Sequence, residues 1–149
     1  MTVEERLLAL VVANREGVLA TIKKDGRPQL SNVLYVWDAE TTTARISTTA
    51  DRAKARNLRR DPRASLYVAG DHFWSYAVAE GLVTIAGPSI EPGDEAGRQL
   101  LAVHSAFYPD LDEEGFFEEM VEAHRLVVKL SVNHTYGIVL DRPPGSADD

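Results

Sequence analysis

The stretch ISTTADRAKARNLRRDPRASLYV, residues 46–68, places a strongly basic segment between two runs typical of β-strands. Its central part, Arg52 to Arg63, holds six of the chain's sixteen Lys and Arg residues and one acid, a net charge of +5. A chain total of −7 therefore leaves −12 for the remaining residues. This concentration of positive charge in an acidic chain predicts an anionic partner.

The basic segment is predicted to form one short helix, from Arg52 to Arg60. Asp51 is suited to N-cap it, and Pro62 ends it because the residue before a proline is disfavoured in the α region. Arg52 and Lys54 then lie in the first turn, where free N–H groups and the helix dipole disfavour cations. A bound phosphate would relieve this conflict. A solvated helix, partly neutralised by Asp51, fits the spacing equally well.

Six strands are predicted along the chain, most of them rich in β-branched residues and bounded by turn residues. They cover residues 17–22, 28–37, 43–49, 64–69, 74–86, and a closing strand over 126–132 and 136–140. Asp25-Gly26 between the first two runs is typical of a tight hairpin turn. Gly81 inside the long fifth strand indicates a bulge. Strands joined mainly as hairpins predict a six-stranded antiparallel split β-barrel.

Three further helices are predicted where apolar residues recur at helical spacing, at 3–13, 94–108 and 112–124. Thr2 and Glu5 form a capping-box pattern at the start of the first. The chain is therefore expected to be mainly β with flanking helices. We expect one domain over residues 1–141 and a flexible tail over residues 142–149.

Composition restricts the class of protein. With no cysteine among 149 residues, disulfides and thiolate chemistry are excluded, as is common in the cytoplasm. The first fourteen residues lack a continuous apolar core, so neither a signal peptide nor a membrane span is expected. A general nucleic-acid binder needs a wide basic face, and here the basic face is one short helix. We therefore expect a cytoplasmic protein that binds neither nucleic acid nor membranes, and that takes a small-molecule substrate.

Two strands are apolar at successive positions, so both of their faces need cover. These are Leu34 to Trp37 and Ala64 to Ala69. A single small domain has few elements with which to bury both faces of these strands, and a second copy of the chain would bury the remaining face. A homodimer is therefore expected, with cover by the chain's own helices as the alternative.

Familiar catalytic motifs are absent from the sequence. It contains no dinucleotide-binding glycine motif, Walker loop or nucleophile elbow. The four histidines, His72, His104, His124 and His134, are scattered singly, so no metal site is expected. A chain without these groups either takes its chemistry from a cofactor or is not an enzyme, and the basic helix favours the cofactor. Trp74 and Tyr76, two apart on a predicted strand, point to one face and are suited either to flank a planar ring or to ordinary packing.

Four segments together resemble a known family: GVLATIKKDGRPQLSNV (17–33), ISTTADRAKARNLRRDPRASLYV (46–68), WSYAVAEG (74–81) and NHTYG (133–137). They are similar to the split-β-barrel family of pyridoxamine-phosphate-oxidase-like flavoproteins, and within it to deazaflavin-dependent oxidoreductases that use coenzyme F(420). The resemblance covers nearly the whole chain. It implies a flavin-binding split barrel, a homodimer with two cofactor sites between the subunits, and hydride transfer from the reduced deazaflavin to an activated organic acceptor such as an enone or quinone.

The resemblance also implies roles for individual residues, with no catalytic side chain assigned. Those that would bind the cofactor phosphate and its tail are Ser47, Thr48, Thr49, Arg52, Lys54 and Arg56, with Asn57 supporting that segment. Those that would surround the ring are Gln29, Ser31 and Asn32, with Trp74 and Tyr76 of the partner subunit. Two alternatives remain open at this stage: an FMN-binding protein of the pyridoxamine-phosphate-oxidase type, and a non-catalytic dimer that stores or carries a cofactor.

Overall fold

The structure is a computed structural model that describes residues 1–141 and 145; the predicted tail over 142–149 otherwise lies outside the described residues. The described part contains four helices, α1 (Val3–Ala13), α2 (Ala53–Arg60), α3 (Glu95–Ser105) and α4 (Glu113–Glu122). Its strands are β1 (Glu16–Ile22), β2 (Pro28–Leu34), β3 (Val36–Asp38), β4 (Thr43–Thr49), β5 (Arg63–Ala69), β6 (Tyr76–Ala86) and β7 (Arg125–Ile138). No helix of the described residues is long and apolar enough to cross a membrane.

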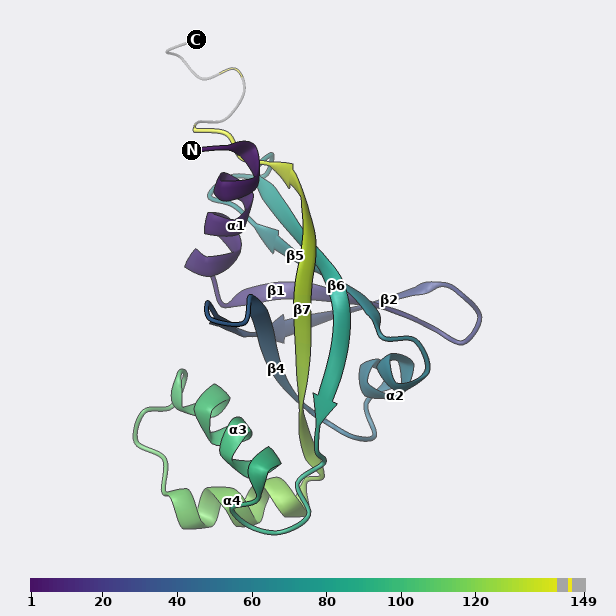
Figure 1. Ribbon diagram of the computed structural model, residues 1–149, viewed down its shortest axis with the longest axis vertical. Coiled ribbons are helices and arrows are strands. Elements are labelled where there is room, and N and C mark those ends of the chain that lie inside the picture. The colour runs from purple at the N-terminus through teal and green to yellow at the C-terminus, as the bar shows by residue number, and fades with distance from the viewer. Residues whose placement is uncertain (142–144, 146–149) are drawn as a thin grey trace.

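All strand pairs are antiparallel, and the sheet order is β2-β1-β5-β6-β7-β4-β3. The two edge strands, β2 and β3, follow each other in the chain and are separated only by Tyr35. The sheet therefore curls until its edges are joined through one residue (Figure 1). This confirms the predicted mainly β split barrel with flanking helices.

One predicted strand, 28–37, is divided in two. The backbone N–H of Tyr35 donates to the carbonyl of Arg15, outside the ladder, and its fully buried hydroxyl donates to the carbonyl of Val11 in α1. β2 then pairs with β1 while β3 pairs with β4. The division at Tyr35 opens a split between β2 and β4.

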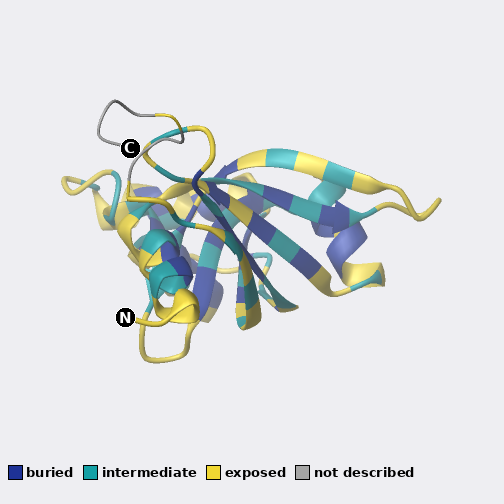
Figure 2. Cartoon of the chain, turned by 90° about the horizontal axis from the view of Figure 1, so that it is seen from above, coloured by how far each residue is buried: buried dark blue, intermediate teal, exposed yellow. Residues whose placement is uncertain are grey.

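The barrel core consists of the inward-facing residues of each strand, because side chains alternate between the two faces. Leu19, Ile46, Leu66 and Leu126 are almost completely buried there, and α1 covers one end with Leu7 and Val11. Buried and partly exposed residues accordingly alternate along the strands in Figure 2.

Helices α3 and α4 form a second, smaller core with the outer face of the sheet. It contains Leu100, Val103, Phe116 and Met120, which pack around Val127 of β7. Val127 faces the helices because its neighbours Leu126 and Val128 face the barrel. α3 is thus fixed against the outer side of β4 and β7.

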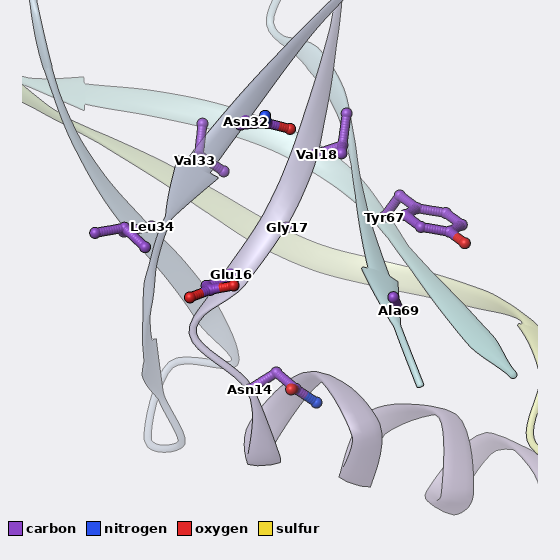
Figure 3. A pocket seen from close by; sticks show the side chains of 9 residues that line it. All are labelled: Asn14, Glu16, Gly17, Val18, Asn32, Val33, Leu34, Tyr67 and Ala69. Carbon is purple, nitrogen blue, oxygen red and sulfur yellow. The ribbon is translucent and has the colours of Figure 1, made fainter. Parts of the chain in front are cut away.

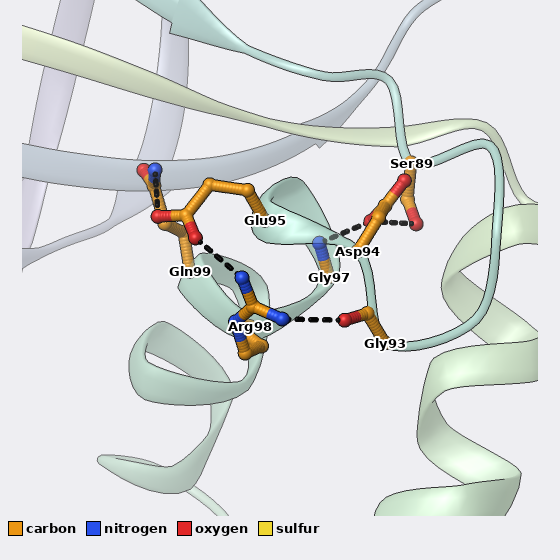
Figure 4. A network of polar contacts seen from close by, with 7 residues as sticks. All are labelled: Ser89, Gly93, Asp94, Glu95, Gly97, Arg98 and Gln99. Carbon is orange, nitrogen blue, oxygen red and sulfur yellow. Dashed lines mark hydrogen bonds and ion pairs between the residues drawn. The ribbon is translucent and has the colours of Figure 1, made fainter.

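Asp94 fixes the start of α3 (Figure 4). One carboxylate oxygen accepts from the Gly97 N–H and the Ser89 hydroxyl, both at 2.8 Å, and the other accepts from the N–H groups of Ile90 and Glu91. Burial alone would raise the pKa of Asp94, but these hydrogen bonds outweigh it and hold the pKa at about 2. The cap is therefore ionised at neutral pH, where it also suits the helix dipole.

Other sequence predictions are confirmed or corrected. The capping box at Thr2 and Glu5 is present, and a register shift between Glu80 and Gly81 confirms the bulge. The predicted strand over 74–86 begins only at Tyr76, because residues 71–74 form a turn closed by the Gly70 N–H donating to the Ser75 carbonyl. The two runs predicted at the end of the chain are one continuous strand, β7.

Candidate functional site

A cavity of about 250 Å³ lies at the split between β2 and β4. Its walls are Asn32, Val33 and Leu34 of β2, Ile46 and Ser47 of β4, Lys54 of α2, Val103, His104, Phe107 and Tyr108 of α3 and the residues after it, and Arg125 of β7. If the β3–β4 register continued, Leu34 would face Ser47. Because β2 turns away at Tyr35, that position holds a space instead.

Three cations converge at this cavity. Lys54 and Arg125 line it, and the charge of Arg52 acts on Lys54 from the start of α2. Within residues 1–141 and 145, the ion pairs are those of Arg6, Arg45, Arg63 and Arg98. Burial, followed by the charges of Arg52 and Arg125, lowers the pKa of Lys54. Asp51 interacts with the charge of Arg52, but within the described residues no carboxylate forms an ion pair with Lys54 or Arg125, and such a cluster of like charges favours an anionic ligand.

The N-terminus of α2 adds free backbone donors to these cations. The prediction that Asp51 N-caps the helix is wrong: Arg52 occupies the N-cap position without a side-chain hydrogen bond. The Asp51 carboxylate instead accepts from the Thr49 hydroxyl at 2.6 Å. The first turn of α2 therefore keeps N–H groups available for an anion.

Ser47 links three elements at the cavity wall. Its Oγ accepts a hydrogen bond from Nη1 of Arg125 at 3.0 Å and lies 2.9 Å from Nε2 of His104. Burial, followed by the charge of Arg125, lowers the pKa of His104, whereas Glu119 raises it. These effects favour the neutral imidazole at neutral pH, and the cavity wall carries a polar group that gains a positive charge when it is protonated.

Asn57 joins α2 to the β1–β2 hairpin. Its Nδ2 donates to Oε1 of Gln29 at 2.9 Å and to Oγ1 of Thr21 at 3.1 Å, and its Oδ1 accepts from Arg60. Asn57 and Thr21 are both buried. This network positions the helix that carries Lys54, and Gln29 takes part in it.

The remaining predicted residues are distributed around the cavity, and their roles in cofactor binding stay predictions. Strand alternation places Ser47 and Thr49 on the face of β4 that looks toward α3, and the buried Thr48 on the opposite face. Ser31 faces inward on β2, whereas Asn32 faces outward. Arg56 is exposed and does not line the cavity.

Trp74 and Tyr76 do not share a strand face, which corrects that expectation. Trp74 lies in the turn before β6, is 56% exposed and packs edge-on against Phe73. Tyr76 lies on β6 and stacks on Tyr67 of β5, with ring centroids 5.5 Å apart.

A second, wider groove of about 480 Å³ runs along the outer face of the sheet (Figure 3). It is lined by Asn14, Glu16, Gly17 and Val18, by Tyr67 and Ala69, and by Asn32, Val33 and Leu34, which also line the first cavity. Residues 32–34 of β2 thus border both spaces.

Sequence reasoning missed three of the polar residues that line the cavity, Arg125, His104 and Tyr108. Arg125 stands opposite Thr49 in the β4–β7 register, a pairing across 76 positions of the chain. His104 reaches Ser47 only because α3 packs on that face of the sheet. The one sequence signal was a cation directly before the strongly apolar run 126–128.

The comparisons with known proteins agree with this architecture. A family model for pyridoxamine 5'-phosphate oxidase matches residues 3–137. An F(420) reductase of known structure is 26% identical, with a TM-score of 0.66 over 86% of this chain and 94% of its own. A conserved hypothetical protein from Mycobacterium tuberculosis is 24% identical, with a TM-score of 0.70 over 100% and 96%. An FAD-binding protein from Mesorhizobium loti, 19% identical with a TM-score of 0.60 over 91% and 92%, shares the fold. The chain therefore belongs to the pyridoxamine 5'-phosphate oxidase family.

Proposed function

We propose that this protein is a deazaflavin-dependent oxidoreductase, which transfers a hydride from reduced coenzyme F(420) to an activated small organic acceptor. The observation that carries the proposal is a cavity at the barrel split that is lined by Lys54 and Arg125, with the charge of Arg52 acting on Lys54 from the start of α2. The 26% identity to an F(420) reductase supports the choice of cofactor. The absence of catalytic motifs from the sequence agrees with chemistry that a cofactor supplies.

The residues present fit such a cofactor. Deazaflavin F(420) carries a phosphate and an acidic tail, so its charge matches several cations and a free helix N-terminus better than one phosphate alone would. FMN ends in a single phosphate and leaves part of the positive charge of α2 unmatched. Val103 and Phe107 supply an apolar wall beside these polar groups, as in most cofactor pockets.

In this proposal the chain binds the cofactor, orients it and shields the reaction from water. When bound, the deazaflavin supplies the hydride chemistry. Lys54 and Arg125 hold the anionic end, while the Asn57 network keeps the helix bearing Lys54 at a fixed distance from β2. The apolar side chains of α3 limit access of water, and the Tyr108 hydroxyl at the cavity rim is available to protonate the product.

Titration of the purified protein with oxidised and reduced F(420), and in parallel with FMN, tests this function. We expect saturable fluorescence changes with F(420), weaker or no binding of FMN, and turnover of enones or quinones by the reduced cofactor. Tight FMN binding in place of F(420) would assign the protein to the flavin-binding alternative. Saturable F(420) binding with no turnover across the acceptor panel would indicate a carrier.

We also propose that the protein acts as a homodimer formed through the outer face of the sheet. Register places Asn32, Val18, Tyr67, Val78 and Tyr136 in one row across five strands. Large apolar side chains beside this row are exposed: Leu30 at 66%, Leu34 at 47% and Ile138 at 48%. An exposed apolar face of this kind is typical of an interface. A partner seated there would cover the groove that borders the cofactor cavity.

Analytical ultracentrifugation tests the dimer. We expect the wild-type protein to sediment as a dimer, and Tyr67→Glu or Leu30→Glu to shift it toward monomer because each buries a charge in an apolar contact. Ile90→Glu, at an exposed position of the loop between β6 and α3 and outside the sheet, serves as the control. Dimers that persist at equal strength in all three variants would place the interface elsewhere.

A further inference from the structure

We infer that His104 is a positioning residue that controls, through its own protonation, whether the Ser47 hydroxyl donates into the cavity, so that the cavity binds an anion more tightly as the pH falls. The site itself follows from the hydrogen bonds between His104, Ser47 and Arg125. The identity of the natural anion, the phosphate of F(420), rests on the proposed function.

The Ser47 hydroxyl can form only a limited number of hydrogen bonds. A hydroxyl has one proton to donate and two lone pairs to accept with. Arg125 only donates, so its contact with Ser47 Oγ at 3.0 Å uses one lone pair. The other contact, at 2.9 Å to His104 Nε2, can run in either direction. The direction decides where the single proton of Ser47 points.

In the neutral tautomer that carries its hydrogen on Nδ1, His104 accepts the Ser47 proton through Nε2. Arg125 donates to Ser47, and a chain from Arg125 through Ser47 to His104 lets each hydrogen bond strengthen the next. In this state Ser47 offers nothing to a ligand. The hydroxyl is occupied by the protein itself.

A protonated His104 carries a hydrogen on both ring nitrogens, so Nε2 donates to Ser47 and the contact reverses. Both lone pairs of Ser47 are then used, and its proton is released toward the cavity that Ser47 lines. Protonation thus adds one donor and one positive charge beside Lys54 and Arg125. Both changes favour an anion.

The charged groups around His104 determine whether binding of an anion raises or lowers the pKa of its imidazole. Arg125 of β7 and Lys54 of α2 line the same cavity, as does Tyr108 beyond α3, while Glu119 of α4 acts from the other side. Phe116 packs edge-on against the ring at 5.1 Å and shields it from water. Burial and Arg125 lower the pKa of the free imidazole. An anion that offsets the cations raises that pKa again, so binding takes up a proton.

Sulfate is a suitable probe, because its charge is constant between about pH 5 and 8, the range over which histidine titrates. NMR titration of the His104 ring signal, identified by its loss in His104→Gln, gives the pKa with and without sulfate. We expect sulfate to raise the pKa and sulfate affinity to be about tenfold higher at the acidic end of this range, since the two effects are reciprocal. Absence of a sulfate-dependent shift overturns the inference.

Variants separate positioning from general charge. His104→Gln is expected to bind sulfate with little pH dependence, whereas His134→Gln, which changes an exposed histidine of β7, keeps the wild-type dependence. Ser47→Ala is expected to lose most of the dependence although His104 still titrates. Full pH dependence in Ser47→Ala would show that His104 acts by charge alone and would overturn the positioning role.

The same pH series with F(420) distinguishes this inference from the proposed function. If sulfate behaves as expected and F(420) does not bind, the cofactor assignment fails while the role of His104 stands. If F(420) binds with equal affinity across the range in wild type and His104→Gln, the role of His104 fails while the cofactor assignment stands.

Discussion

Lys54→Ala is expected to weaken binding of F(420) by about 100-fold, the largest functional effect of any single substitution that we predict. Lys54 lies half-buried at the cavity wall, where the charges of Arg52 and Arg125 act on it. Removing one partner of a shielded charge pair costs about 2–5 kcal/mol, and about 1.4 kcal/mol corresponds to a tenfold change in affinity. Fluorescence titration of the variant and the parent under identical salt measures the loss.

The stability of the cofactor-free variant provides a second, independent readout. A half-buried ammonium group among other cations destabilises the free protein, and the lowered pKa of Lys54 expresses the same cost. Lys54→Ala should therefore leave the free energy of unfolding unchanged or raise it. Weaker binding caused by a damaged fold would instead appear as lower stability.

Lys24→Ala is the matched control, because it removes the same charge from the exposed tip of the β1–β2 hairpin. Its net-charge change is identical, so any long-range electrostatic effect is reproduced. We expect its F(420) affinity to stay within a factor of about two of the parent, as for screened surface charges. Equal losses in the two variants would contradict a specific anion site at Lys54.

The local features of this fold are visible in the sequence because they depend on neighbouring residues. The capping box at Thr2 and Glu5, the Asp25-Gly26 hairpin and the bulge at Gly81 each follow from the chemistry of a few consecutive positions. The short basic helix ends before Pro62 for the same reason. A propensity argument is sufficient wherever the deciding contact is local.

The features that were missed depend on contacts between distant segments. β2 and β3 separate at Tyr35 because its hydroxyl is held by a carbonyl of α1, which no pattern in residues 28–37 encodes. Asp51 is a good N-cap by type, but here its carboxylate takes the hydroxyl of Thr49 instead. The Asp51 carboxylate could accept from the helix N–H groups or from the Thr49 hydroxyl, and residue type alone does not determine which of the two it takes.

The sequence predicted only part of the candidate site, because the other residues reach it through contacts between distant segments. The cations at the start of α2, Arg52 and Lys54, are two positions apart in the sequence, and their spacing predicted an anion site. Arg125 and His104 reach the same cavity through the β4–β7 register and the packing of α3, both of which are long-range. Half of the polar wall, namely His104, Tyr108 and Arg125, therefore comes from residues 104–125, where the sequence analysis predicted no site residue.

Gly81→Ala is expected to lower the free energy of unfolding by about 3 kcal/mol or more, the largest effect on stability that we predict. A Cβ at this position would lie 1.7 Å from the carbonyl oxygen of Ser131 and 2.8 Å from its carbonyl carbon. Both atoms belong to the backbone of β7, so they cannot move aside as a side chain would. The clash must open the β6–β7 ladder at the bulge, and overpacking against fixed atoms commonly costs about 1–3 kcal/mol or more.

The damage should also extend to the site, because β7 carries Arg125 and pairs with the strand that carries Ser47. Denaturant unfolding measures the stability loss, and F(420) titration below the unfolding transition measures the effect on binding. Gly26→Ala is the control: its Cβ would meet nothing within 4 Å, and its positive φ of +88° costs only about 1 kcal/mol. If the two glycine variants lose equal stability, the close approach of β6 to Ser131 does not hold the ladder in register, and the bulge is tolerant of a side chain.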